Sequence, residues 1–394
     1  MDPCSARLPG LPPASTACGL YVHVPFCLRK CRYCDFYSLA PPHSVSDYLE
    51  GVSAEIARAG KAGLFCDTVY LGGGTPSLLS AAAVAGILER LDGAFRIGSG
   101  AEVTLEANPG TIAGGKLASY RAAGVNRLNL GVQSLREEKL RFLGRIHGPD
   151  EAVQAFAEAR AAGFERVGID LIYGLPGEGP GEWLSELEAA LALEPDHLSC
   201  YLLTIEPGTP LGCDLAAGRL QAAAEETAAE LFLLTAERLA AGGFAHYEIS
   251  NFARDLGGAG GQAVSRHNLK YWTGAPYLGF GPGAHSFLPP QRFWNPPDLG
   301  RWLAALRSGK PPAAGSEDLD GGQQVLEALF LGLRTAWGVD LAGLREGLGW
   351  DLLAERAETV AEFTERGFLR VEEGRLFPTV RGMLVAERLA VELC

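Results

Sequence analysis

Strand-like apolar runs alternate with helical runs over residues 20–242, and this alternation limits the possible folds more than any other feature of the chain. The apolar runs lie at 20–26, 67–73, 101–107, 127–133, 166–174 and 197–204. Runs with helical spacing lie at 46–60, 81–95, 111–123, 136–141, 149–162, 181–193 and 221–242. Strands joined by such helices form parallel β–α–β units, so the sequence predicts an α/β fold containing a partial (β/α)6 TIM-like barrel.

The alternation stops after residue 242, which predicts a change of architecture. A Gly-rich run at 255–265 follows, and a Pro-containing stretch around 289–316 is typical of a boundary. Beyond it, helical runs lead into GFLRVEEGRLFPT, which is typical of a β-hairpin that turns at Glu373 and Gly374. We therefore predict four parts: a Pro-rich lead (1–19), the barrel (20–242), a connecting region (243–316) and a smaller α+β, winged-helix-like domain (317–394).

Composition excludes several classes of protein. The formal net charge of −13 argues against nucleic acid as a partner, because no excess of Lys and Arg is available to neutralise phosphates. No apolar run approaches the roughly 20 residues that a membrane-spanning helix needs. The first residues lack both the apolar segment of a signal peptide and the Arg-rich pattern of a transit peptide, so we expect a cytoplasmic protein.

Three of the nine cysteines form the motif CxxxCxxC at Cys27, Cys31 and Cys34. Three thiolates can hold one iron–sulfur cube and leave its fourth iron open to a further ligand. A structural zinc site is the alternative, but such sites commonly use a second CxxC pair, which this sequence lacks. The aromatic residues near the cysteines are expected to shield a cluster from water: Phe26, Tyr33, Phe36 and Tyr37.

Polar or Gly-rich residues stand where the predicted strands end. The run GGGTP (72–76) follows the second strand, Glu106 and Gln133 end the third and fourth, and Asp170 lies in the fifth. Chemistry in such barrels gathers at the carboxyl ends of the strands, so the group predicts one shared pocket. Ordinary loop composition explains any one of these residues equally well.

These motifs resemble those of the radical S-adenosylmethionine superfamily. The segments YVHVPFC, GGGTPS, GVQS and DLIYGLPGE resemble one branch, the anaerobic coproporphyrinogen-III oxidase family with its haem chaperone HemW branch, from about residue 20 to the C-terminus. The resemblance implies a radical SAM barrel and a [4Fe–4S] cluster on Cys27, Cys31 and Cys34. It also implies that the open iron binds S-adenosylmethionine, which the cluster cleaves to methionine and a deoxyadenosyl radical.

The resemblance also implies roles for residues around that ligand. Gly72 to Gly74 let the backbone approach the methionine ammonium, and Glu106 accepts hydrogen bonds from the ribose. Gln133 contacts the ribose or the carboxylate, and Arg145 neutralises the carboxylate. Asp170 suits a ribose or ammonium group. The residues expected to bind S-adenosylmethionine are Tyr21, Tyr33, Gly73, Gly74, Thr75, Glu106, Gln133, Arg145 and Asp170; no catalytic side chain is assigned.

Two features separate the branches. The oxidase motif resembles CxxxCxxCxC, whereas Phe36 stands at the position of the additional cysteine, and the oxidase has a longer segment before its first strand. HNLKYW (267–272) matches the HNxxYW motif associated with haem binding in the HemW branch, with His267 as the iron ligand and Tyr271 and Trp272 stacking on the porphyrin. A buried structural role for His267 is the alternative, and weaker candidates for the ligand are His285 and His23.

The sequence therefore predicts a haem chaperone with a radical SAM core. The alternative is oxygen-independent coproporphyrinogen III oxidase, and a third class is a zinc-stabilised scaffold without radical chemistry. The partners that the resemblance allows are haem and haem-accepting apoproteins, among them respiratory-chain proteins reached by transient membrane association, and a second copy of the chain.

Overall fold

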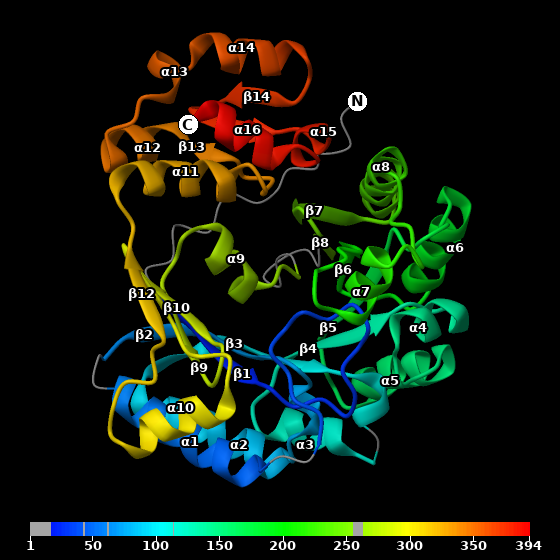
Figure 1. Ribbon diagram of the computed structural model, residues 1–394, viewed down its shortest axis with the longest axis vertical. Coiled ribbons are helices and arrows are strands. Elements are labelled where there is room, and N and C mark those ends of the chain that lie inside the picture. The colour runs from blue at the N-terminus through cyan, green and yellow to red at the C-terminus, as the bar shows by residue number, and fades with distance from the viewer. Residues whose placement is uncertain (1–16, 42–43, 61–62, 113, 255–262) are drawn as a thin grey trace.

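The computed structural model describes residues 17–41, 44–60, 63–112, 114–254 and 263–394. Six parallel strands form the centre of one curved sheet, in the order of the sequence (Figure 1). They are β1 (Cys18–Val24), β2 (Phe65–Gly73), β3 (Arg96–Ala107), β4 (Arg127–Gln133), β5 (Arg166–Tyr173) and β6 (His197–Leu202). The predicted α/β barrel fold is confirmed. Strand β1 begins within the predicted lead, whose residues 1–16 lie outside the described residues.

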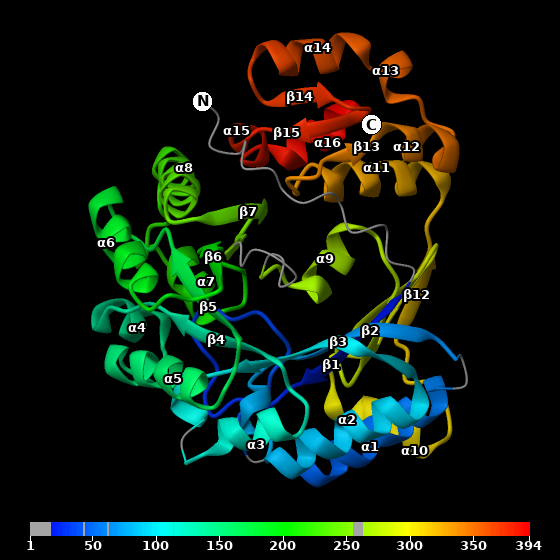
Figure 2. The same cartoon turned by 180° about the vertical axis from the view of Figure 1, so that it is seen from behind.

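Helices connect the parallel strands and cover one face of the sheet (Figures 1 and 2). Ser44 and Ser80 begin α1 and α2, where each side chain accepts a hydrogen bond from a backbone N–H of the first turn. The helices are α1 (Val45–Ala59), α2 (Ala81–Ala94), α3 (Lys116–Ala122), α4 (Glu137–Leu143), α5 (Pro149–Ala161), α6 (Pro180–Leu191) and α8 (Glu225–Ala241). A further short helix, α7 (Pro210–Ala216), was not predicted.

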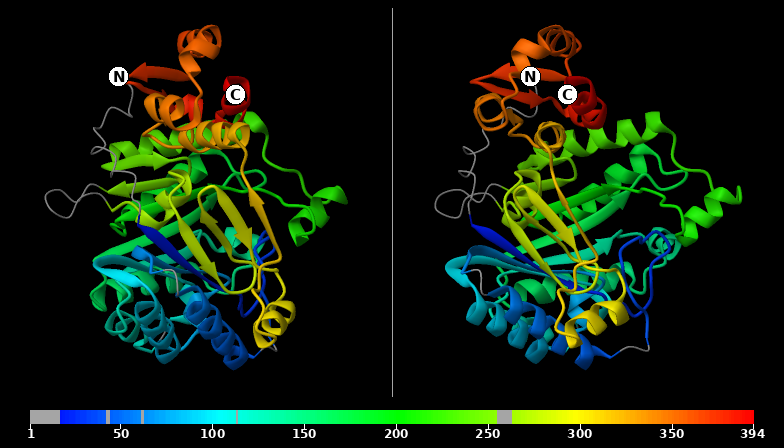
Figure 3. Two further views of the ribbon diagram at one scale, coloured as in Figure 1. Left: turned by 90° about the vertical axis from the view of Figure 1, so that its left-hand side faces the viewer. Right: turned by 60° about the vertical axis from the view of Figure 1, so that its left-hand side comes forward.

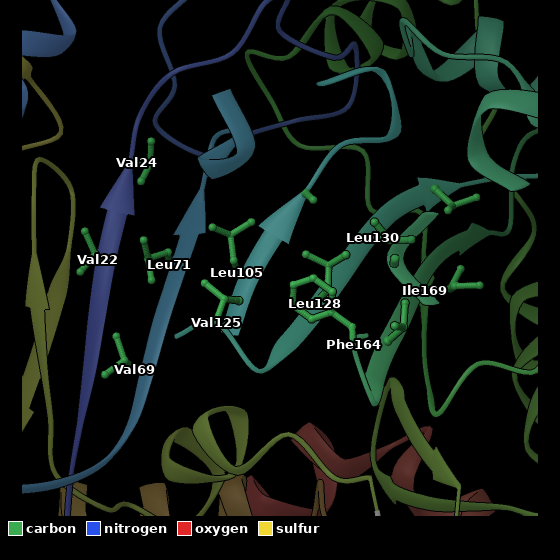
Figure 4. Packing of buried hydrophobic residues seen from close by; sticks show 14 of the residues in the cluster. Val22, Val24, Val69, Leu71, Leu105, Val125, Leu128, Leu130, Phe164 and Ile169 are labelled. Atoms are coloured by element: carbon green, nitrogen blue, oxygen red, sulfur yellow. The ribbon is translucent and has the colours of Figure 1, made fainter. Parts of the chain in front are cut away.

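The core lies between this sheet and its helices. Val22, Leu71, Leu105 and Leu130 come from four neighbouring strands and are fully buried (Figure 4). Strands of a parallel sheet are covered on both faces, which explains why their sequences are nearly continuous apolar runs.

The sheet continues into the segment that follows residue 242. On one edge β8 (Asn251–Arg254) pairs with β6, and β7 (Phe244–Glu248) pairs with β8. On the other edge β9 (Tyr277–Phe280) runs parallel to β1, and three antiparallel strands follow: β10 (His285–Leu288), β11 (Gln291–Trp294) and β12 (Gly315–Asp318). The stretch 289–316, where we expect a boundary, contains β11, α10 (Leu299–Arg307), which packs on α1, and the first residues of β12.

Helix α9 (Arg266–Trp272) carries the HNLKYW motif and lies on the side of β1–β3 opposite α1 and α2 (Figures 1 and 2). Ser265 caps it, and its backbone N–H at His267 donates to Glu102 on β3 (3.1 Å). Lys270 pairs with Asp67 on β2 (2.6 Å) and donates to the carbonyl of Ala17 (2.8 Å). These contacts hold α9 near the amino-terminal parts of the strands, away from the cysteine loop.

The last part of the chain forms a smaller unit above the sheet, with its own core around Leu329, Phe363, Leu376 and Leu389 (Figure 3). The predicted hairpin is confirmed, with Glu373 and Gly374 at positive φ in its turn. Its elements are α11 (Gly321–Gly332), β13 (Val339–Asp340), α12 (Leu341–Leu348), α13 (Leu352–Glu355), α14 (Ala357–Glu365), β14 (Leu369–Glu372), β15 (Arg375–Pro378), α15 (Val380–Met383) and α16 (Ala386–Leu393).

Among the described residues, none of the helices has both the length and the apolar character that crossing a membrane requires.

Candidate functional site

The three clustered cysteines lie on the loop between β1 and α1. Backbone hydrogen bonds close this loop: Leu39 N–H donates to Pro25 (2.6 Å), and Cys27 N–H donates to Leu39 (3.0 Å). The other side of the loop is held against the end of α4, where Arg32 N–H donates to Leu143 (3.1 Å) and the Arg29 guanidinium donates to Gly144 (2.8 Å). The loop is thus anchored at two places before any ligand binds.

The three thiols are near neighbours. Burial raises the pKa of the Cys34 thiol, and Cys31 and Cys27 add to that rise. Within the described ranges no three His, Cys, Asp or Glu side chains are close enough to bind one metal ion. The thiolates of a [4Fe–4S] cluster bind different irons and need not converge on one point, so this arrangement fits a cluster better than a single zinc ion.

Two neighbours touch the sulfur atoms, and one expected neighbour does not. Thr75 Oγ1 lies 3.5 Å from Cys27 Sγ, and Arg145 Nη1 lies 3.3 Å from Cys31 Sγ. Phe36 is 69% exposed, so the prediction that it shields a cluster is wrong. The next residue, Tyr37, is held instead, because its hydroxyl accepts from Leu299 N–H (2.7 Å).

The glycines after β2 form a tight backbone passage beside this loop. Gly73 has φ of +106°, and a Cβ there would lie 2.5 Å from the His23 ring. A Cβ at Gly74 would lie 2.8 Å from the carbonyl oxygen of Phe26, and Gly74 N–H donates to Val24 (2.8 Å). Only glycine fits at these two positions, which brings bare backbone next to the cysteines.

Glu106 faces the same passage from the end of β3. Its carboxylate accepts from Gly73 N–H (3.1 Å) and from the Tyr70 hydroxyl (2.7 Å). Burial raises the pKa of Glu106 to about 7, with a further rise from Asp170 and an opposing effect of the Tyr70 hydrogen bond. Asp170 is itself held by the Asn129 amide (2.7 Å), and burial raises its pKa. The two predicted carboxyl groups therefore lie close enough for Asp170 to affect the pKa of Glu106.

Gln133 and Arg145 complete the predicted group. Gln133 ends β4 at φ of +68°, a strained conformation for a residue other than glycine. A side chain at Gly131 would meet Gln133 Nε2 at 3.0 Å and Arg145 Nη2 at 3.5 Å, so both side chains crowd that glycine. Arg145 donates to the Gly131 carbonyl (2.6 Å), while its buried Nε has no hydrogen-bond partner among the described residues. That nitrogen is a donor available to an anionic ligand.

The two predicted tyrosines have different surroundings. Tyr33 packs on Leu143, Ile172 and Leu175, and burial raises its pKa although Arg145 beside it has the opposite effect. The hydroxyl of Tyr21 donates to His23 Nδ1 (3.0 Å), because His23 Nε2 donates to the carbonyl of Tyr37 (2.9 Å). His23 therefore has no free nitrogen for a metal in this structure.

His267 lies apart from the cysteine pocket and is 1% exposed. Its Nδ1 is 2.8 Å from Thr68 Oγ1, and its Nε2 is 3.0 Å from the Tyr271 hydroxyl. Burial lowers the pKa of His267 to about 3, so the ring is neutral. Both nitrogens are occupied, and binding of iron by His267, the predicted haem ligand, would require one of these hydrogen bonds to break. The geometry instead matches the alternative of a buried structural histidine.

Two residues near the pocket were missed. Tyr70 stacks on His267 (5.2 Å between ring centroids) and donates to Glu106, so it joins α9 to the pocket. Its position two residues before Gly72 on β2 puts it on the same face, which is a signal that the sequence contains. His147 donates to the Val132 carbonyl (3.0 Å) and contacts the Asn108 amide (3.1 Å), contacts that no local motif predicts.

Comparisons with known proteins agree with these motifs. The model of the radical SAM superfamily matches residues 21–190, and that of the HemN C-terminal domain matches residues 319–385. The haem chaperone HemW of Mycobacterium tuberculosis is 38% identical over 97% of this chain and 96% of its own length. HemW of Bacillus subtilis is 32% identical over 94% of this chain and 97% of its own length.

A solved structure supports the fold. The coproporphyrinogen III oxidase HemN of Escherichia coli, described as a radical SAM enzyme, superposes with a TM-score of 0.82 over 97% of this chain and 91% of that chain, at 22% identity. At that identity the likeness concerns the fold alone. The predicted relationship is confirmed by the sequence matches: the chain belongs to the radical SAM superfamily and, within it, to the family that contains the HemW haem chaperones.

Proposed function

We propose that this chain is a haem chaperone, which binds haem and delivers it to acceptor proteins in the cytoplasm. One observation carries the proposal: the match to curated haem chaperones extends over nearly the full length of both chains, at 38% identity for the first of them. The position of Phe36 supports it over the oxidase, because a solvent-exposed phenylalanine stands where the oxidase motif has another cysteine.

We also propose that the barrel binds a [4Fe–4S] cluster and S-adenosylmethionine. Cys27, Cys31 and Cys34 would bind three irons, and the buried Nε of Arg145 would donate to the ligand's carboxylate. Glu106 holds the backbone at Gly73 in place for the ammonium, with Gln133 and Asp170 at the ribose side. When bound, the cluster and S-adenosylmethionine would supply one-electron chemistry.

The test is delivery of haem between proteins. The anaerobically reconstituted chain is loaded with haem and mixed with a haem-free acceptor protein, and transfer is followed by the Soret band. A chaperone is expected to give a transfer rate that rises with acceptor concentration, because transfer occurs in a complex of the two proteins. Passive release would give a rate independent of acceptor and would contradict the proposal.

A parallel assay addresses the alternative. The same preparation is incubated with coproporphyrinogen III, S-adenosylmethionine and a reductant under strict anaerobiosis. We expect no protoporphyrinogen IX; robust turnover would identify the chain as an oxidase.

A further inference from the structure

A cavity of about 550 Å³ lies between the antiparallel edge of the sheet and helix α11, beside α9. Strands β9, β10 and β11 form one wall, and residues of α9 and α11 form the other. Its volume is in the range of pockets that bury a small organic ligand. Six ring-bearing side chains line it: Tyr271, Tyr277, His285, Phe287, Trp294 and Phe330.

The register of the strands makes the sheet wall of this cavity an aromatic surface. His285 on β10 stands opposite Trp294 on β11, and the two rings stack with centroids 5.9 Å apart and planes 22° apart. Phe287, two residues later and on the same face, stands opposite Tyr277 on β9. A wall of rings favours a flat, largely apolar ligand.

His285 is the histidine that lines this cavity. It is exposed, and among the described residues neither of its ring nitrogens has a hydrogen-bond partner. A neutral imidazole with a free nitrogen is a common axial ligand of haem iron.

The HNLKYW motif reaches the cavity through Tyr271 and not through His267. The Tyr271 ring lines the cavity and meets Tyr277 edge-on at 4.7 Å, while its hydroxyl contacts His267 Nε2 on the other side. His267 therefore fixes the position of a cavity wall. A substitution at His267 would weaken binding in the cavity without removing a ligand atom.

The polar end of the cavity is already paired. Arg292 forms ion pairs with Glu317 (3.0 Å) and with Glu327, and it lies over the Phe287 ring. One guanidinium faces two carboxylates, so this end offers no spare positive charge to acidic groups. A ligand with carboxylate arms would point them toward solvent.

We propose that the haem required by the proposed function binds in this cavity, with His285 as its iron ligand and His267 as a residue that positions Tyr271. The inference rests on that function and goes beyond it by assigning the site and the ligand atom. The flat macrocycle lies against the ring wall of β9–β11, and its propionates face solvent.

The test is an anaerobic haem titration of full-length variants, followed by the Soret band and by electron paramagnetic resonance of the ferric form. The variants are His285→Gly, His267→Gln and Trp294→Ala, each checked for folding by circular dichroism and for iron content of the reconstituted cluster. We expect His285→Gly to lose the signature of an axial nitrogen ligand and to bind haem about tenfold or more weakly. Added imidazole should restore that signature.

His267→Gln is expected to keep the axial signature and to bind haem more weakly. Trp294→Ala should weaken the binding of haem and also that of metal-free protoporphyrin IX. The metal-free porphyrin has no axial ligand, so its affinity depends on contact with the aromatic side chains of the cavity. If His267→Gln loses the signature while His285→Gly keeps it, the assignment to His285 is overturned and the proposed chaperone function stands. If the wild-type protein binds no haem at all, both proposals fail.

Discussion

The cysteine loop and the aromatic cavity are built on two different parts of one sheet. The loop and its pocket follow the carboxyl ends of long parallel strands, and each contributing motif is contiguous in sequence. The cavity is built on four-residue strands at the antiparallel edge, and its wall residues are spread from Tyr271 to Leu331. Sites at the ends of parallel strands leave readable motifs, whereas sites on short paired strands depend on register.

The two regions also differ in how free their candidate ligands are. In the cysteine pocket the buried Nε of Arg145 has no hydrogen-bond partner among the described residues, but both ring nitrogens of His23 are hydrogen-bonded. In the region of α9 and the cavity, both ring nitrogens of His267 are hydrogen-bonded, whereas those of His285 have no partner among the described residues. Residue type alone therefore does not identify a ligand; the partners of each nitrogen decide.

A connected set of contacts joins the two regions. Tyr271 contacts His267, the His267 ring stacks on Tyr70, and the Tyr70 hydroxyl donates to Glu106, which holds Gly73. An occupant of the cavity would thus touch the first member of a series that ends at the backbone of the cysteine pocket. The comparison can be tested by disturbing each region and the link between them.

The largest effect is expected from Cys31→Ala. Removing one of three thiolates should abolish the reconstituted cluster, measured as iron and acid-labile sulfide per chain and as iron–sulfur absorbance. Cys213→Ala is the matched control, because Cys213 is an exposed free cysteine on α7. Haem binding should persist in Cys31→Ala, since the cavity is built on other strands. Full cluster content in Cys31→Ala would show that the loop does not bind it.

An intermediate effect is expected from the titration of Glu55, which should make the free energy of unfolding depend on pH. Glu55 lies beside the cavity region. This buried carboxyl on α1 accepts from Gly281 N–H (2.8 Å) before β10 and from the Asn295 amide (2.7 Å) after β11. Burial raises its pKa from 4.5 to about 7, against the effect of these hydrogen bonds. Folding therefore favours the protonated form of Glu55. Its contribution to the free energy of unfolding is complete below pH 4.5 and is lost as the pH rises through about 7.

The change in unfolding free energy due to Glu55 is expected to be at most about 3 kcal/mol between about pH 5 and pH 8. Urea unfolding across that range, compared with Glu55→Gln, measures it. Burial also raises the pKa values of Glu106 and Glu248 to about 7. Both groups titrate in the wild-type protein and in Glu55→Gln, so their contributions cancel when the pH dependences of the two proteins are subtracted. Equal pH slopes for the two proteins would contradict the prediction.

The smallest effect is expected from Tyr70→Phe. This substitution removes the hydrogen bond from the Tyr70 hydroxyl to Glu106 and keeps the ring that stacks on His267. Loss of the hydrogen bond to Glu106 should weaken the binding of S-adenosylmethionine by about 1 kcal/mol, which is roughly fivefold in Kd. Calorimetry measures this Kd. Any change of that Kd on adding haem should shrink in the variant. Tyr277→Phe, which alters a cavity hydroxyl, should leave the Kd without haem unchanged. An unaltered Kd in Tyr70→Phe would remove Tyr70 from the pocket's support.

Much of the barrel could be predicted from sequence, because its signals are local. The strand that ends before Cys27, the glycines at 72–74 and the turn at Glu373 and Gly374 each follow from periodicity or from backbone preferences of a few residues. The proximity of Glu106 and Asp170 also followed, since the ends of neighbouring parallel strands meet at one edge of the sheet. The exposure of Phe36 could not be predicted from the sequence, because local composition does not indicate which way a loop side chain points.

The sequence by itself determined the parallel strands, the cysteine loop and the family, since contiguous motifs and alternating patterns encode them. Only the tertiary structure decided that the segment after residue 242 extends the same sheet, and that His267 is enclosed while His285 is open. The physical reason is the distance along the chain: His267 is hydrogen-bonded to Thr68, which lies 199 residues earlier, and a contact of that range leaves no periodic signal in the sequence.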